Sequence, residues 1–215
     1  MDRDTMFITF EGIEGAGKSL QIARAGEYLR GKGRSCLLTR EPGGTDFGRE
    51  LREVLLRPGG AAREPWCELL LYLADRRQHL KEVIEPALAR GETVLCDRYQ
   101  DATRAYQGAA RGIALEEIEK AARLLGIIEP SKTILLDLDP EVGLGRARRR
   151  NSMDPSAAAE GRFEGEAISF HKRVRQAYLD LAEAQPQRIY VIPAADDPDA
   201  VFARIAVLID KWIYG

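Results

Sequence analysis

The segment GIEGAGKS, residues 12–19, lies directly behind the short apolar run of residues 7–10 and ahead of a helical stretch. Glycines at this spacing allow backbone N–H groups to converge on phosphate oxygens, and the N-terminus of the next helix adds a favourable dipole. A strand, a glycine-rich loop and a helix in this order begin a P-loop α/β fold. This one segment therefore constrains both the fold and the class of ligand.

The loop predicts a site for a nucleoside triphosphate. Lys18 is expected to reach its β- and γ-phosphates, and the Ser19 hydroxyl is expected to bind Mg²⁺. A tight turn with no ligand is the alternative, but the spacing, the Lys-Ser pair and the position between strand and helix favour phosphate binding. The residues expected to hold the nucleotide are Gly12, Ile13, Glu14, Gly15, Ala16, Gly17, Lys18 and Ser19.

Alternating apolar and helical patterns extend this fold along the chain. Strands are expected at residues 7–10, 36–39, 94–96, 133–138 and 189–192. Helices are expected at residues 17–30, 46–56, 65–90, 101–110, 115–125, 140–150, 167–184 and 199–212, and Pro86 is expected to kink the third of them. The pattern predicts a P-loop NTPase of three α/β/α layers around a five-stranded, mostly parallel sheet, with ligands at the carboxyl ends of the strands.

Chain length and composition limit the remaining possibilities. The 215 residues fit one domain, residues 1–215, and the Ala-, Ser- and Gly-rich segment 151–165 with Pro155 fits a lid excursion, placed at about residues 146–165. A net charge of −2 gives no broad cationic field, so no nucleic-acid partner is expected. Three cysteines without metal-ligand spacing suit reduced thiols in the cytoplasm, and no apolar run is long enough to predict a membrane partner.

The third predicted strand delivers Asp97, Arg98 and Tyr99 to the sheet edge where the phosphate loop lies. Asp97 is the second predicted magnesium residue, and its alternative role is to cap the following turn. The planar fork of Arg98 matches two phosphate oxygens, which implies a second anion site beside the first. Arg40 and Arg76 are candidates to converge on it, although arginines taken singly are more often surface charges.

At this point the residues resemble a known family. The loop occurs with TREPGGT (residues 39–45), YLADRRQH (72–79), DRY (97–99) and AYQG (105–108), followed by DPE (139–141) and a basic stretch. This set, in this order over most of the chain, resembles bacterial thymidylate kinase. The resemblance implies ATP and dTMP as substrates, Mg²⁺ as cofactor and a homodimer.

The resemblance also implies roles for individual residues. Tyr72 falls where an aromatic ring stacks on thymine, Arg76 where the base is contacted, and Arg98 where the acceptor phosphate is held. Tyr106 falls where a side chain crowds the 2′ position and so favours deoxyribose. The substrate-binding positions implied are Arg40, Tyr72, Arg76, Arg98, Thr103, Tyr106 and Gln107.

A positive charge between the two phosphates is expected to come from the lid. Gly15 stands where some relatives carry an arginine, so the loop itself supplies none. Arg146, Arg149 and Arg150 lie at i, i+3 and i+4 on one predicted helix face, for which a solvated or nucleic-acid-binding surface is the alternative. Within the subgroup resembled, the catalytic set implied is Glu14, Lys18, Arg148, Arg150 and Arg162.

Three positions depart from the family pattern. Ala102 replaces a common serine near the acceptor, Gly161 replaces a lid aspartate and so predicts altered pairing within the lid, and Leu73 replaces a small residue and so predicts a slightly reshaped base pocket.

Three competing functions remain. Another nucleoside or nucleoside-monophosphate kinase is the nearest, because it would share the scaffold. A GTP-binding switch would need an Asn-Lys-x-Asp guanine reader, yet the only asparagine is Asn151. An ATP-binding protein that binds nucleic acid through the arginine cluster is the third, but the near-neutral net charge of the chain argues against it.

Overall fold

The computed structural model describes residues 5–59, 62–154 and 158–214. Its strands form one sheet in the order β2-β3-β1-β4-β5, and every neighbouring pair is parallel. Each strand ends within one residue of its predicted bounds, so the predicted five-stranded sheet is confirmed. The strands are β1 (Phe7–Glu11), β2 (Cys36–Arg40), β3 (Thr93–Asp97), β4 (Lys132–Asp137) and β5 (Ile189–Pro193).

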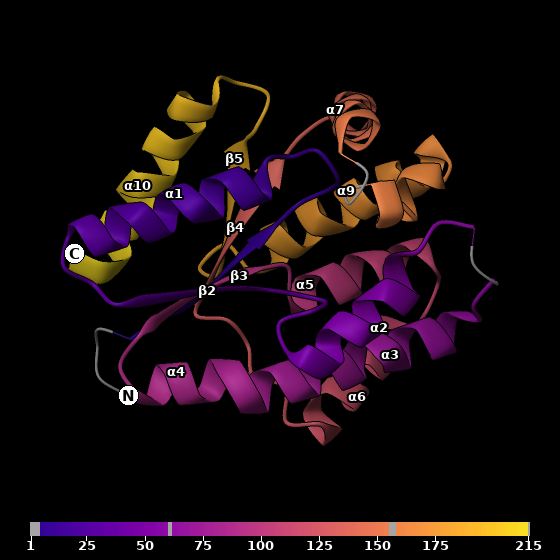
Figure 1. Cartoon of the computed structure of the whole chain (residues 1–215), viewed down its shortest axis with the longest axis horizontal. Helices are drawn as coiled ribbons and strands as arrows, with labels where there is room; N and C mark the ends of the chain where they lie inside the picture. Colours follow the sequence, from indigo (N-terminus) through magenta and orange to yellow (C-terminus); the bar gives the residue numbers. More distant parts are fainter. Residues whose placement is uncertain (1–4, 60–61, 155–157, 215) are drawn as a thin grey trace.

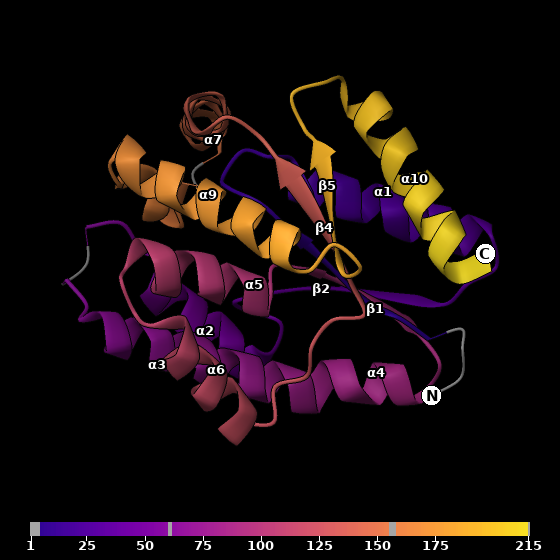
Figure 2. The ribbon, with the colours of Figure 1, turned by 180° about the vertical axis from the view of Figure 1, so that it is seen from behind.

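Helices cover both faces of the sheet, as the alternating pattern predicted. Helices α1 (Lys18–Gly31) and α10 (Pro198–Tyr214) lie together on one face (Figure 1). On the other side α9 (Ile168–Ala184) packs against β4, β5 and α5 (Gln100–Thr103), as seen from behind in Figure 2. Over the described residues, the other α-helices with defined bounds are α2 (Asp46–Leu56), α3 (Pro65–His79), α4 (Glu85–Ala89), α6 (Leu115–Leu124) and α7 (Pro140–Met153).

The long helix predicted for residues 65–90 is continuous but changes its winding. Between α3 and α4 lies a π-helical turn, η1 (Leu80–Ile84), where the N–H of Glu85 reaches back to the carbonyl of Leu80. Pro86 follows at once, and its missing N–H and bulky ring oppose a regular α-turn at this point. The predicted disturbance therefore appears as a wider turn.

A second π-helical segment, η2 (Arg104–Ala110), continues α5. The sequence pattern predicted a plain helix over residues 101–110. The wider turn ends with the N–H of Arg111 donating to the carbonyl of Tyr106 at 3.0 Å. Such turns rotate the side chains that they carry, and Tyr106 and Gln107 both lie on this one.

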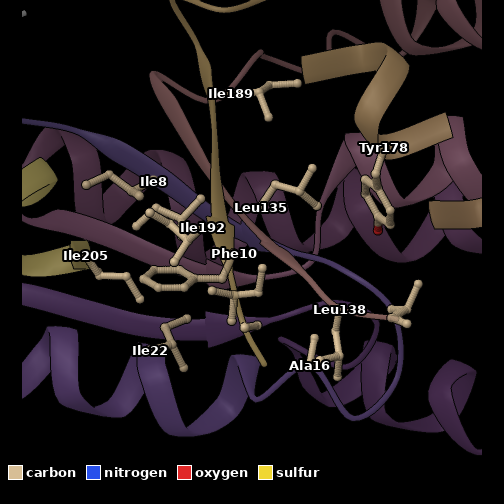
Figure 3. Packing of buried hydrophobic residues seen from close by; sticks show 14 of the residues in the cluster. Ile8, Phe10, Ala16, Ile22, Leu135, Leu138, Tyr178, Ile189, Ile192 and Ile205 are labelled. Atoms are coloured by element: carbon tan, nitrogen blue, oxygen red, sulfur yellow. The ribbon is translucent and has the colours of Figure 1, made fainter. Parts of the chain in front are cut away.

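The main core lies between the sheet and the α1, α9 and α10 helices. Ile8 and Phe10 of the fully buried β1 share this cluster with Ile192 and Ile205 (Figure 3). Each such side chain contributes about 1.5–3 kcal/mol when fully buried, so the central strand is held firmly. The phosphate loop begins directly at the end of this strand.

Parallel pairing brings the functional sequence segments to one edge. Asp97 at the end of β3 is level with Phe10 of β1 and with Arg40 of β2. The predicted lid begins within α7 and returns through a 3-10 turn, η3 (Phe163–Gly165). Pro155 lies outside the described residues. Over the described part of the chain, no helix combines the length and apolar character needed to cross a bilayer.

Candidate active site

The phosphate loop is shaped around its own lysine. The ammonium of Lys18 donates to the carbonyls of Gly12 and Ile13, both at 2.8 Å. Burial, helped by repulsion from Arg98, lowers the Lys18 pKa to about 8. A phosphate that replaced these carbonyls would meet a cation already held at the centre of the loop.

Two glycines give this loop its path. Gly15 has φ +74° and Gly17 has φ +90°, both in the left-handed region that favours glycine. A Cβ on Gly15 would lie 2.1 Å from the carbonyl oxygen of Gly143 in α7. A Cβ on Gly143 would lie 2.5 Å from the carbonyl oxygen of Glu14. The loop and the lid-bearing helix therefore touch backbone to backbone.

Ser19 and Asp97 meet as predicted. The Ser19 hydroxyl donates to Asp97 Oδ2 at 3.0 Å. A hydroxyl and a carboxylate are hard oxygen donors, which suits Mg²⁺, a cation that usually keeps several waters and takes further ligands from phosphates. The described residues hold no cluster of three or more His, Cys, Asp or Glu side chains arranged for a metal.

Glu14 of the loop lies between two residues predicted for the acceptor. Its Oε1 accepts from the Arg98 guanidinium at 2.8 Å and from the Tyr106 hydroxyl at 2.7 Å. Burial alone would raise the Glu14 pKa, but Arg98 and the other donors hold it far below its usual value. Arg98 has φ +69°, unusual for a residue other than glycine, and its guanidinium stacks 4.9 Å from the Tyr106 ring centre.

Arg76 is fixed in the wall of the cavity. Only 2% of it is exposed, and its guanidinium donates to Glu41, Gln100 and Thr103 at 2.6–2.8 Å and to the Tyr99 carbonyl at 2.9 Å. This many partners hold the planar group in one orientation. Tyr72, one turn earlier on α3, lies in the same wall.

These groups line a single cavity of about 670 Å³. From the predicted site it contains Glu14, Gly15, Gly17, Lys18, Ser19, Arg40, Tyr72, Arg76, Asp97, Arg98, Thr103, Tyr106, Gln107 and Arg150. Gly12, Ile13 and Ala16 of the loop are buried, and Arg148 and Arg162 are absent from the described lining. The structure therefore brings together both predicted anion sites but only one of the three predicted lid arginines.

The lid is docked by ion pairs that sequence reasoning missed. Arg52 of α2 donates through two nitrogens to both carboxylate oxygens of Glu160, each at 2.7 Å. Arg150 pairs with Glu164 at 3.2 Å inside the lid. Arg162 instead points toward α2 and α3, where it pairs with Glu68 and donates to the Leu55 carbonyl at 3.1 Å.

The family model of thymidylate kinase matches residues 10–205. The chain belongs to the thymidylate kinase family. It is accordingly a nucleoside-monophosphate kinase, a phosphotransferase.

Individual family members resemble it over nearly the full length. The thymidylate kinase of Solidesulfovibrio magneticus is 49% identical over 210 residues, covering 97% of this chain and 100% of the relative. That of Deinococcus radiodurans is 50% identical over 201 residues, covering 93% and 94%. The crystal structure of thymidylate kinase from Ehrlichia chaffeensis superposes with a TM-score of 0.76 at 31% identity, covering 96% of this chain and 98% of that one.

Two of the three departures from the thymidylate kinase pattern have a clear structural outcome. Leu73 lies outside the cavity, in an apolar cluster with Leu69 and Ile118, so the predicted reshaping of the base pocket is wrong. At Gly161 a Cβ would lie 2.8 Å from the amide nitrogen of Asn151. The pairing inside the lid runs through Arg150 and Glu164 instead. Ala102 lines the cavity, as predicted.

Proposed function

We propose that the chain transfers the γ-phosphate of ATP to dTMP, giving dTDP and ADP, with Mg²⁺ bound through Ser19 and Asp97. The observation that carries this proposal is that Lys18 and Arg98 line one cavity with Glu14 close to both. One cation suits the donor phosphates and the other the acceptor phosphate.

The walls of the cavity suit a pyrimidine deoxynucleotide. The Tyr72 ring offers an aromatic face for the base, and Arg76 with Thr103 and Gln107 supplies polar groups at its edge. Tyr106, held by its hydrogen bond to Glu14, would restrict the 2′ side of the sugar. Arg40, half-exposed at the rim, completes the proposed acceptor site.

Phosphoryl transfer needs positioning and charge stabilisation more than a general base. Lys18 and Arg98 would hold donor and acceptor oxygens in line, and the docked lid would exclude water that could otherwise accept the phosphoryl group. Bound Mg²⁺ would neutralise charge on the donor phosphates. The thiols at Cys36, Cys67 and Cys96 are free, which suits the proposed cytoplasmic location.

A coupled ADP-release assay across the common nucleoside monophosphates tests the proposal. We expect turnover with ATP and dTMP, and loss of turnover when EDTA removes Mg²⁺. Preferred use of another monophosphate would instead support the related kinase function, and no turnover of dTMP by folded protein would overturn the proposal.

The lid arginines are expected to differ in their effect on catalysis. Arg150 and Arg148 are both exposed residues of α7, but Arg150 lines the cavity and Arg148 is absent from the described lining. We therefore propose Arg150 as the main lid cation, with Arg148 and Arg162 as further candidates. Arg150→Ala is expected to lower kcat about 100-fold, as loss of one transition-state donor does. Steady-state kinetics of the Arg148→Ala and Arg162→Ala variants rank the three, and equal effects of Arg148→Ala and Arg150→Ala would contradict this order.

We also propose a homodimer formed through α2 and α3. Trp66 and Leu70 of α3 are 41% and 57% exposed, and Phe47 and Val54 of the adjoining α2 are 45% and 47% exposed. Figures 1 and 2 show these two helices side by side at the edge of the molecule. Neighbouring exposed apolar side chains of this size mark interaction surfaces.

Leu70→Asp is expected to shift the protein from dimer to monomer, because it places a charge at the centre of this apolar surface. Size-exclusion chromatography with light scattering measures the change. Val207→Asp is the matched control, since Val207 is 68% exposed and belongs to α10, a helix that lies far from α3 in Figure 1. A dimer that survives Leu70→Asp at micromolar concentration would exclude this surface.

A further inference from the structure

Glu68 of α3 is a buried carboxylate that the proposed reaction does not use. Only 1% of it is exposed. Its Oε1 accepts from the amide nitrogen of Gln107 at 2.8 Å, and its Oε2 accepts from the Arg162 guanidinium. Arg111 lies farther away, with its Nε 3.5 Å from Oε1. The carboxylate thus joins a residue of the cavity wall to a residue of the lid.

The chemistry of Glu68 decides how the Gln107 amide is turned. Burial acts to raise the Glu68 pKa, but the hydrogen bonds from Gln107 and Arg162 bring it below its usual value, so the group is ionised at neutral pH. An ionised carboxylate only accepts hydrogen bonds. The NH₂ group of Gln107 must therefore face Glu68, and among the described residues its carbonyl oxygen has no donor of its own.

We propose that Glu68 is a positioning residue that holds the Gln107 carbonyl oxygen toward the base and so selects pyrimidines that carry an N–H at ring position 3. Thymine has this donor, whereas cytosine has an unprotonated nitrogen there. An acceptor facing an acceptor leaves both without a partner, which discriminates strongly in a buried site. This inference rests on the proposed function, in which Gln107 faces the base.

The lid takes part in this arrangement through Arg162. Besides its contact with Glu68, the Arg162 backbone N–H donates to the Leu56 carbonyl at 3.2 Å, so the residue is fixed on α2 when the lid is docked. In a Glu68→Gln variant, Arg162 is expected to keep the amide oxygen. The NH₂ of the new side chain would then face Gln107 and turn its amide over, placing a donor toward the base.

Equilibrium binding of dTMP and dCMP tests the proposal without depending on turnover. Titration calorimetry, by competition where binding is weak, gives the ratio of the two dissociation constants. Glu68→Gln is expected to reduce the preference for dTMP at least tenfold. Glu166→Gln is the matched control, because Glu166 pairs with Arg111 at 2.5 Å and makes no hydrogen bond to Gln107 within the described part of the chain. Its preference should equal that of the wild type.

The positioning role would be overturned if folded Glu68→Gln kept its preference for dTMP over dCMP within twofold of the wild type. If that variant is too unstable to purify, a double variant with Glu68→Gln and Arg162→Gln removes both charges together. Its preference for dTMP over dCMP is also expected to fall, because no carboxylate orients Gln107. An unchanged preference in the double variant would equally contradict the inference. Failure of the wild type to phosphorylate dTMP would count against the proposed function instead.

Discussion

Lys18→Met is expected to lower kcat at least 100- to 1000-fold, an effect of about 3–4 kcal/mol on the transition state. The ammonium lies within the loop, 2.8 Å from two of its carbonyls, where nothing else among the described lining residues can take its place. Methionine keeps the length of the side chain but removes the charge. KM for dTMP is expected to change much less, because Arg98 and not Lys18 lies in the proposed acceptor site.

Lys32→Met is the control for loss of a lysine charge. Lys32 is the C-cap residue that follows α1, and it pairs with Asp210 at 2.7 Å on the surface, with 37% of its side chain exposed. An exposed pair of this kind is screened by solvent and contributes little to folding, and it has no route to the cavity. Single-turnover kinetics should show wild-type chemistry in Lys32→Met. A rate for Lys18→Met within tenfold of wild type would remove Lys18 from the catalytic set.

Local pattern was enough to predict the strands and most helices. The strand bounds were found because apolar runs end at Gly, Pro or charged residues, as at Asp97 and Arg40. Parallel topology followed from the alternation of strands with helices, and it placed the two sets of predicted site residues at one edge. The π-helical turns were not predicted, because a backbone hydrogen bond between residues i and i+5 cannot be recognised from the spacing of apolar residues.

Contacts between distant side chains could not be predicted in this way. Arg52 and Glu160 are 108 positions apart, and no spacing relates them. The helix face predicted for Arg146, Arg149 and Arg150 was partly confirmed, since Arg146 and Arg150 line the cavity and Arg149 does not among the described residues. The family resemblance supplied Arg148 and Arg150, but only the packing of α7 on the loop decides which one turns inward.

Gly15→Ala is expected to disturb both stability and catalysis, because it adds a carbon where the loop touches α7. Three backbone atoms of Gly143 lie 2.1–3.0 Å from the position that the new Cβ would take. The left-handed backbone and the overpacked contact together should lower the free energy of unfolding by about 2–5 kcal/mol. Since α7 also carries Arg150, its displacement should lower kcat as well, which denaturant titration and steady-state kinetics would measure on the same preparation.

Gly33→Ala separates the clash from the backbone strain. Gly33 has φ +75°, nearly the value of Gly15, but apart from its chain neighbours no heavy atom of the described residues lies within 4 Å of the position of its Cβ. Gly33→Ala should therefore lower the free energy of unfolding only by the cost of the left-handed backbone, about 1–2 kcal/mol, and leave kcat unchanged. Equal decreases in the free energy of unfolding in Gly15→Ala and Gly33→Ala would show that α7 moves away from the added carbon at no cost. In that case the loop, without any arginine of its own, would not fix the helix that brings Arg150 to the phosphates.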